Sequence, residues 1–236
     1  MTSRLPRTLI ALAGSALVLV GCSGSPTGDA ATTTASSSAP TSQAEPPAAQ
    51  SEAAAEAAAD PATATDGRTA GLASALRVGD LPAGWTVQSN PTPAGDLGNS
   101  LAGICGYTFT SEARRTAKFA VVGVDPAGNA SVASEAIVYD SPDGAALALT
   151  ELRAAYGACP PDQYTFTTPP PADGLQPGAV VVTYELGDTR GAQAVVAQAR
   201  GSVVSIVLGS DAAVAIGAGA SIAQRLTALP AAAVGE

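Results

Sequence analysis

The stretch SPDGAALALTELRAAYGAC, residues 141–159, decides the fold because it is the clearest helix in the chain. Ser141 can cap its first turn, Pro142 stands at the favoured first helical position, and Asp143 complements the positive end of the helix dipole. Five residues recur at spacings of four, three, four and three, so they form one stripe that faces a core. They are Ala145, Leu149, Leu152, Tyr156 and Cys159.

Segments on both sides of this helix have the composition and alternation of strands. The expected strands are 85–88, 107–110, 116–124 and 131–139 before the helix, and 164–168, 180–186, 192–200 and 202–208 after it. Further helices are expected at 72–78 and 211–229. Short turns join 116–124 to 131–139 and join the last three strands, which favours antiparallel pairing. The predicted fold class is α+β, an antiparallel β-sheet with flanking helices.

The first 22 residues predict export. Arg4 and Arg7 precede an apolar run at 9–20, which is too short to span a bilayer and is typical of a signal peptide at 1–21. The run ends in Leu19-Val20-Gly21-Cys22, the pattern of a bacterial lipobox, in which the cysteine thiol receives a diacylglycerol with palmitate-type chains. We therefore expect lipid attachment at Cys22 on the outer face of the cytoplasmic membrane. The alternative is an ordinary signal peptide with an incidental cysteine.

Residues 22–69 follow as an Ala, Thr, Ser and Pro-rich stretch without one aromatic residue. Such a composition cannot form a core and predicts a disordered tether. The nine aromatic residues all come later, so we expect a folded domain at 70–230 and a C-terminal tail at 231–236. Arg in place of Lys, with abundant Ala, Gly and Val, is typical of a high-GC actinobacterium.

Charge and composition exclude several classes of function. The 236 residues carry 20 acidic and 11 basic side chains, a net charge of −9, and no histidine. The acidic balance argues against a nucleic-acid partner, because a phosphate backbone needs clustered Lys and Arg. The lack of histidine removes the commonest general base and zinc ligand. We expect no cofactor, no metal and no enzymatic activity.

Two cysteines remain once Cys22 is assigned to lipid. In an oxidising compartment Cys105 and Cys159 are expected to form a disulfide. The alternative is a pair of free thiols in a reactive or metal site, which no histidine or neighbouring cysteine supports.

Two groups of charged residues could form functional sites, but each also has a purely structural interpretation. Asp140 and Asp143 could act as a catalytic pair, but their position at a helix start favours capping. The basic group could meet an anionic ligand or a lipid headgroup, although it also fits the exposed start of a strand. It consists of Arg114, Arg115 and Lys118.

Three other features read as turns or packing positions. Glu185 and Asp188 flank an expected hairpin, where solvated charges are usual. Asn129-Ala-Ser131 matches a glycosylation sequon and reads as a turn in a bacterial chain. Gly217-Ala-Gly219 permits close helix packing and lacks the context of a nucleotide site.

Several segments resemble the extracellular sensor domain of mycobacterial PknH-type kinases and their lipoprotein relatives. They are Ala136-Ile-Val-Tyr-Asp-Ser-Pro-Asp-Gly-Ala-Ala-Leu147, Tyr156-Gly-Ala-Cys159, Val195-Val-Ala-Gln-Ala-Arg-Gly-Ser-Val-Val204 and Ile222-Ala-Gln-Arg-Leu226. The resemblance implies a disulfide-linked antiparallel sheet flanked by helices, with a cleft for an unknown small ligand. This chain departs from that pattern in having Tyr156 where a Trp is common, and in lacking cysteines for a second disulfide.

The sequence leaves three functional classes open. A sensor-like or small-ligand-binding lipoprotein leads, and an envelope protein-protein interaction or structural lipoprotein is the alternative. An enzyme comes last. The ligand-binding residues cannot be named from the sequence.

Overall fold

The computed structural model describes residues 60–90, 100–101, 104–187 and 191–236. The expected signal peptide, Cys22 and most of the expected tether lie outside the described residues. Within the described part, no helix combines the length and the apolar character that crossing a membrane requires.

The core of the fold is a seven-stranded sheet in the order β1-β2-β3-β7-β6-β5-β4, in which every neighbouring pair is antiparallel. The strands are β1 (Thr86–Asn90), β2 (Arg115–Val124), β3 (Ala130–Tyr139), β4 (Tyr164–Thr167), β5 (Val180–Leu186), β6 (Ala192–Arg200) and β7 (Val203–Gly209). The predicted β2–β3 hairpin and the β5–β6–β7 meander are both present. They join where β7 pairs with β3, which leaves β1 and β4 at the two edges.

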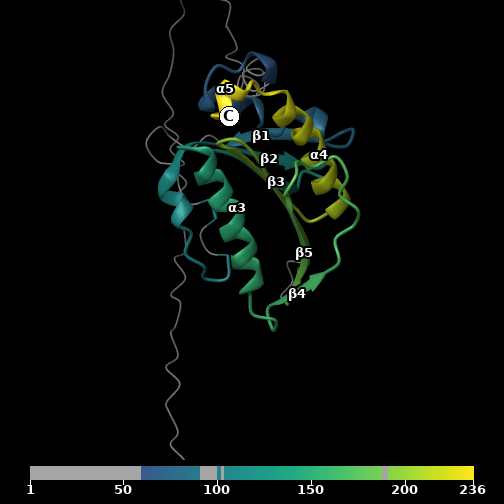
Figure 1. Ribbon diagram of the computed structural model, residues 1–236. Helices are drawn as coiled ribbons and strands as arrows, with labels where there is room; N and C mark the ends of the chain where they lie inside the picture. Colours follow the sequence, from purple (N-terminus) through teal and green to yellow (C-terminus); the bar gives the residue numbers. More distant parts are fainter. Residues whose placement is uncertain (1–59, 91–99, 102–103, 188–190) are drawn as a thin grey trace, which may run out of the picture. The chain divides into compact units, whose positions relative to one another are not determined.

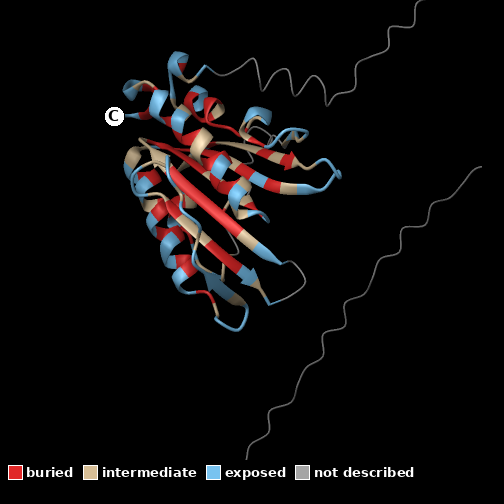
Figure 2. Cartoon of the chain, turned by 90° about the vertical axis from the view of Figure 1, so that its right-hand side faces the viewer, coloured by how far each residue is buried: buried red, intermediate tan, exposed pale blue. Residues whose placement is uncertain are grey.

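Helices cover both faces of the sheet (Figure 1). They are α2 (Gly67–Ala73), α3 (Pro142–Gly157), α4 (Ala212–Ala228) and α5 (Ala231–Val234), with 3-10 turns η1 (Pro61–Thr63), η2 (Val78–Asp80) and η3 (Thr110–Arg114). We call the side covered by α3 and η3 the α3 face, and the side covered by α2, α4 and α5 the α4 face. Each face has its own buried apolar cluster. Figure 2 shows burial concentrated on the central strands and the helix surfaces against them. The predicted α+β class is confirmed.

Helix α3 forms as its sequence predicts. The hydroxyl of Ser141 accepts a hydrogen bond from the backbone N–H of Gly144, and Pro142 is the first helical residue. All five residues of the predicted stripe, Ala145 to Cys159, are buried against the α3 face. Burying such a stripe is what holds an amphipathic helix on a sheet.

The folded domain extends beyond its expected limits of 70 and 230 at both ends. The helix expected at 72–78 instead forms as α2 at Gly67–Ala73, because Asp66 and Thr69 form a reciprocal capping box, and Val78 begins the 3-10 turn η2. The expected tether is therefore wrong for residues 60–69, which form η1 and the start of α2. Ala64, upstream of that helix, is already part of the buried cluster. At the other end, the residues expected as a tail form α5, and Val234 is fully buried.

Residues 107–110 do not form the expected strand. The N–H of Tyr107 closes a turn on the carbonyl of Ile104, and Thr110 begins the 3-10 turn η3. The N–H of Thr110 donates to the carboxylate of Glu151 instead of to a neighbouring strand. The aromatic residues of this segment pack on each other instead, since the rings of Tyr107 and Phe109 meet edge to face at 5.1 Å.

Candidate functional site

The disulfide ties the loop before η3 to the end of α3. Cys105 and Cys159 are bonded, with their Cα atoms 5.0 Å apart, so the predicted pairing is present and the free-thiol alternative is wrong. Cys105 adopts a positive φ of 48°, a conformation that most residues avoid. The bond therefore holds a constrained loop against the C-terminal end of α3.

Four aromatic rings gather beside this bond, where α3 ends above β4 and β5. Phe166 of β4 lies opposite Tyr184 of β5 in the sheet register, and Tyr164 lies two pairs away on the same face. Tyr156 reaches them from α3. The five ring contacts have centroid distances of 5.4 to 6.4 Å. Aromatic pairs at such distances stabilise one another beyond their buried area.

An open hollow lies next to these rings. It has a volume of about 490 Å³, and we call it the aromatic hollow. Its lining consists of Tyr156, Gly157, Cys159, Pro161, Phe166 and Val182. Phe166 is 43% exposed, one of the few large apolar side chains of the described residues that face solvent to this extent. Rings, proline, valine and disulfide sulfur together make a surface suited to an apolar or aromatic group.

The tyrosine that lines the aromatic hollow, Tyr156, is not activated for chemistry. Burial raises the pKa of the Tyr156 hydroxyl well above its usual value, and neighbouring Tyr184 raises it further. The phenol is therefore protonated throughout the physiological range. A nucleophile or general base would need the opposite shift.

A second hollow of about 420 Å³ lies along the other end of α3. Its two charged lining residues already have partners within the chain. Arg153 donates to the carbonyl oxygen of Gly178, and Glu236 pairs with Arg200 at 3.3 Å. The charged groups of this second hollow are therefore already engaged within the chain, whereas the aromatic hollow is lined by apolar groups.

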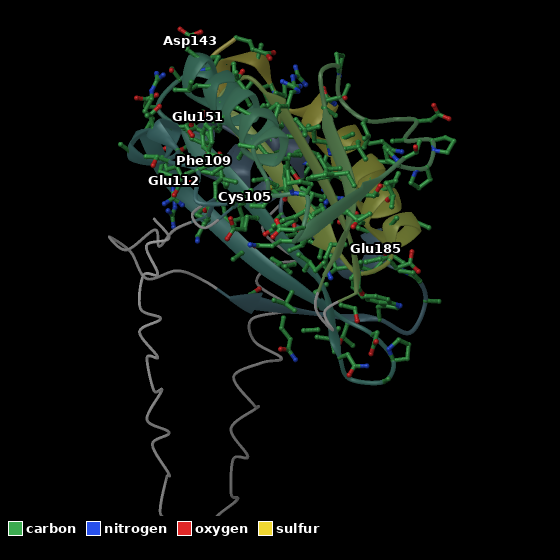
Figure 3. The ribbon with its side chains drawn as sticks, turned by 90° about the horizontal axis from the view of Figure 1, so that it is seen from below. Cys105, Phe109, Glu112, Asp143, Glu151 and Glu185 are labelled. Atoms are coloured by element: carbon green, nitrogen blue, oxygen red, sulfur yellow. A yellow bond between two sulfur atoms is a disulfide. The ribbon has the colours of Figure 1, made fainter. Side chains whose placement is uncertain are left out.

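Buried polar residues near η3 form a network that the sequence did not reveal. Glu151 of α3 is 6% exposed and accepts hydrogen bonds from the backbone of Thr110 and Ser111. The nearby Tyr139 hydroxyl is buried without a hydrogen-bond partner, and its pKa is raised, mainly by burial and then by Glu112. Figure 3 shows Glu151, Phe109 and Glu112 together on one side of the domain, with Glu185 far from them. One signal in the sequence could have indicated that Glu151 is buried. It lies one helical turn after the buried Ala148 and next to the apolar stripe of α3.

The basic group, for which an anion site was one of the two interpretations, is neutralised by neighbouring acids. Arg114 pairs with Asp140 at 2.9 Å, and Arg115 pairs with Glu112 at 2.8 Å. Lys118 pairs with Glu135 at 3.3 Å, so each of the three positive charges has a carboxylate partner. The structure favours the interpretation as a strand start, with the correction that the side chains of Arg115 and Lys118 are buried rather than exposed.

The acidic candidates are likewise not a catalytic pair. Asp140 accepts hydrogen bonds from Arg114 and Ser141, and these bonds lower its pKa. Asp143 is exposed in the first turn of α3, where it complements the positive end of the helix dipole, while Ser141 is the residue that caps the helix. Glu185 is exposed on β5, and Asp188 lies outside the described residues.

The turn and glycine motifs are structural. Asp125 accepts a hydrogen bond from the backbone of Asn129 and another from the hydroxyl of Ser131, which confirms the turn. In α4, a Cβ on Gly219 would lie 2.8 Å from Val196, so this glycine permits close packing on β6. Gly217 has no neighbour within 4 Å of that position and is not required for packing.

No protein-family model matches the chain, and no curated protein is significantly similar to it. Among solved structures, it is similar to the extracellular domain of PknH from Mycobacterium tuberculosis, with 14% sequence identity and a TM-score of 0.40. That similarity covers 61% of this chain and 82% of the PknH domain. Because the identity and the TM-score are this low, the resemblance to the PknH-type sensor domain stays a prediction.

Proposed function

We propose that this chain is a lipid-anchored, extracytoplasmic lipoprotein whose α+β domain is non-catalytic and binds a ligand through an apolar or aromatic group. The aromatic hollow is the single observation that carries the binding proposal. The expected signal peptide and lipobox support export and anchoring at Cys22. The disulfide fits an oxidising compartment outside the cytoplasm.

The chemistry at the hollow supports binding over catalysis. Its lining contains no carboxylate, amine or free thiol, and its tyrosine hydroxyl is held protonated. General acid–base catalysis needs a group whose pKa lies near the working pH. A shaped apolar surface without such a group recognises a ligand and leaves it unchanged.

A small apolar probe can test the hollow directly. Toluene should produce saturable NMR shifts at the amides of Gly157, Cys159 and Val182 in the full-length protein. Gly157→Leu should abolish them, because the position has no neighbour within 4 Å and the new side chain would fill the hollow. Gly217→Leu is the matched control, since it adds the same side chain to an equally open helix position in α4. Shifts that never saturate, or that survive Gly157→Leu, would contradict the proposal.

An envelope protein-interaction domain is the second candidate. The observation that favours it is the exposed Phe166 on β4, an edge strand that pairs only with β5. A protein ligand could fill the same hollow with one of its side chains.

A further inference from the structure

The β4 strand presents an accessible sheet edge beside the aromatic hollow. It is the last strand in the sheet order, and residues 165–167 are all exposed. Figure 1 shows β4 at the end of the sheet away from β1. An exposed edge can accept a further strand through main-chain hydrogen bonds.

The register shows which backbone groups point outward. The N–H of Gly187 donates to the carbonyl of Gln163 at 3.0 Å, whereas the N–H of Leu186 turns the other way and donates to Gly191. Bonded and non-bonded pairs alternate along an antiparallel ladder, so Thr165 and Thr167 bond to β5. The N–H and C=O of Phe166 therefore face away from β5. Beyond the sheet ladder, no hydrogen bond of Phe166 occurs among the described residues.

The two faces of β4 differ in chemistry. Phe166 lies opposite Tyr184 on the α3 face and lines the aromatic hollow. Thr165 lies opposite Glu185, so both side chains are on the α4 face. Side chains of an added strand would alternate between these two environments.

Unpaired charge near β4 is acidic. Among the described residues, four carboxylates have no hydrogen-bond or ion-pair partner. They are Asp143, Asp162, Asp173 and Glu185. Asp162 precedes β4, Asp173 lies in the connection that follows it, and Glu185 is on the adjacent strand. Each described Arg and Lys, by contrast, contacts an acid, a carbonyl or an aromatic ring.

We propose that β4 binds an extended segment of a partner protein as an additional antiparallel strand with alternating apolar and basic side chains. The residue opposite Phe166 exchanges two main-chain hydrogen bonds with it and directs an apolar side chain to the aromatic hollow. The residues on either side direct basic side chains past Thr165 toward Glu185. This inference rests on the proposed function, because the apolar side chain is the group that occupies the hollow.

The occupant is a partner rather than a second copy of this chain. Pairing of two β4 strands would bring two Glu185 carboxylates to the same face without a basic residue between them, since β4 itself is uncharged. Three prolines at 169–171 follow the strand and restrict pairing to a short segment. The interaction is therefore local, and the side chains set its specificity.

The test uses detergent-solubilised full-length protein and an eight-residue peptide in which Lys alternates with Val and Phe. We expect saturable binding, and slow amide exchange at Phe166 only in the complex. Phe166→Ala should weaken binding through lost ring contact. Phe166→Pro should weaken it about tenfold more, because it also removes the outward N–H, and an edge strand tolerates proline. Equal affinities for the two variants would overturn main-chain pairing.

Charge and site controls separate the remaining outcomes. Glu185→Gln should weaken the Lys peptide several-fold and reduce its salt dependence, whereas Asp143→Asn, at an equally exposed and unpaired acid, should have no effect. A peptide with Glu in place of Lys should not bind, and equal binding would refute the proposal. Concentration-dependent dimerisation of the protein that prevents the peptide from binding would also refute the proposal. Toluene binding without peptide binding would refute this inference and retain the proposed function, while failure of both would reject the hollow itself.

Discussion

The carboxylate of Glu151 accepts the backbone N–H of Ser111 at 3.0 Å, across 40 residues of sequence. Its other oxygen accepts the N–H of Thr110 at 2.9 Å and the Thr110 hydroxyl at 2.5 Å. One side chain of α3 therefore caps the start of η3 and fixes the approach to β2. Burial raises the pKa of Glu151, but hydrogen bonds from Ser111 and Thr110 lower it by more, so the net shift is downward.

Glu151→Gln should destabilise the domain by about 2 kcal/mol, because a charged acceptor is lost and its amide group opposes a backbone donor. The folded state holds the lower pKa, so the unfolded state takes up the proton first as pH falls below the ordinary value of 4.5. The contribution is present above that value and is lost on acidification. Urea unfolding should show that the variant loses less stability than wild type between about pH 5 and pH 3. Asp143→Asn is the control, and an unchanged acid dependence in Glu151→Gln would contradict the assignment.

The local elements could be predicted because their signals lie within one segment. Ser141 and Pro142 mark the start of α3, and the expected strands 180–186 and 192–200 match β5 and β6. The expected strand at 107–110 failed because Glu151, far away in sequence, takes the backbone donor of Thr110. Local alternation contains no information about such a distant acceptor.

The candidate site was only partly visible in the sequence. The inward direction of Tyr156 and Cys159 followed from the helical stripe. The meeting of Tyr156 with Phe166 and Tyr184 depends on the β4–β5 register and on where α3 crosses the sheet. Both are tertiary features, so a helix residue and two strand residues could not be assigned to one hollow.

The ion pair between Asp80 and Arg225 should be a major support of the α4 face. Two guanidinium nitrogens lie 2.6 and 2.7 Å from the two carboxylate oxygens, and Arg225 also donates to the carbonyls of Ala73 and Ala75. The Asp80 side chain is only 4% exposed. Asp80→Asn should therefore cost about 3 to 5 kcal/mol by leaving a buried charge unpaired.

Chemical denaturation can compare this pair with a surface pair in the same protein. Glu236→Gln removes the partner of Arg200, an interaction at 3.3 Å with a 41% exposed carboxylate, and should cost less than about 1 kcal/mol. Similar losses for Asp80→Asn and Glu236→Gln would show that the Asp80 contact adds nothing beyond a surface interaction.

Cys22→Ser should move the protein from the membrane fraction to the soluble fraction. Each buried methylene of an acyl chain contributes about 0.8 kcal/mol, so two or three chains anchor a protein stably where one is marginal. Intact-mass analysis of the wild type should show the added acyl mass, and cell fractionation should follow the variant. Sedimentation of Cys22→Ser with membranes, together with a wild type that lacks acyl mass, would rule out the lipobox assignment.

Loss of the Cys105–Cys159 bond should both destabilise the domain and weaken ligand binding at the aromatic hollow. The cysteines are 54 residues apart, and closing a loop of that length restricts the unfolded chain by about 4 kcal/mol. Cys159 also lines the hollow, so a loosened end of α3 would move Tyr156 away from Phe166. We expect the Cys105→Ser/Cys159→Ser variant to unfold at a lower temperature and to bind toluene more weakly. Reductant should produce both effects in the wild type and neither in the variant. An unfolding temperature that is unchanged after complete reduction would show that the disulfide does not stabilise the domain.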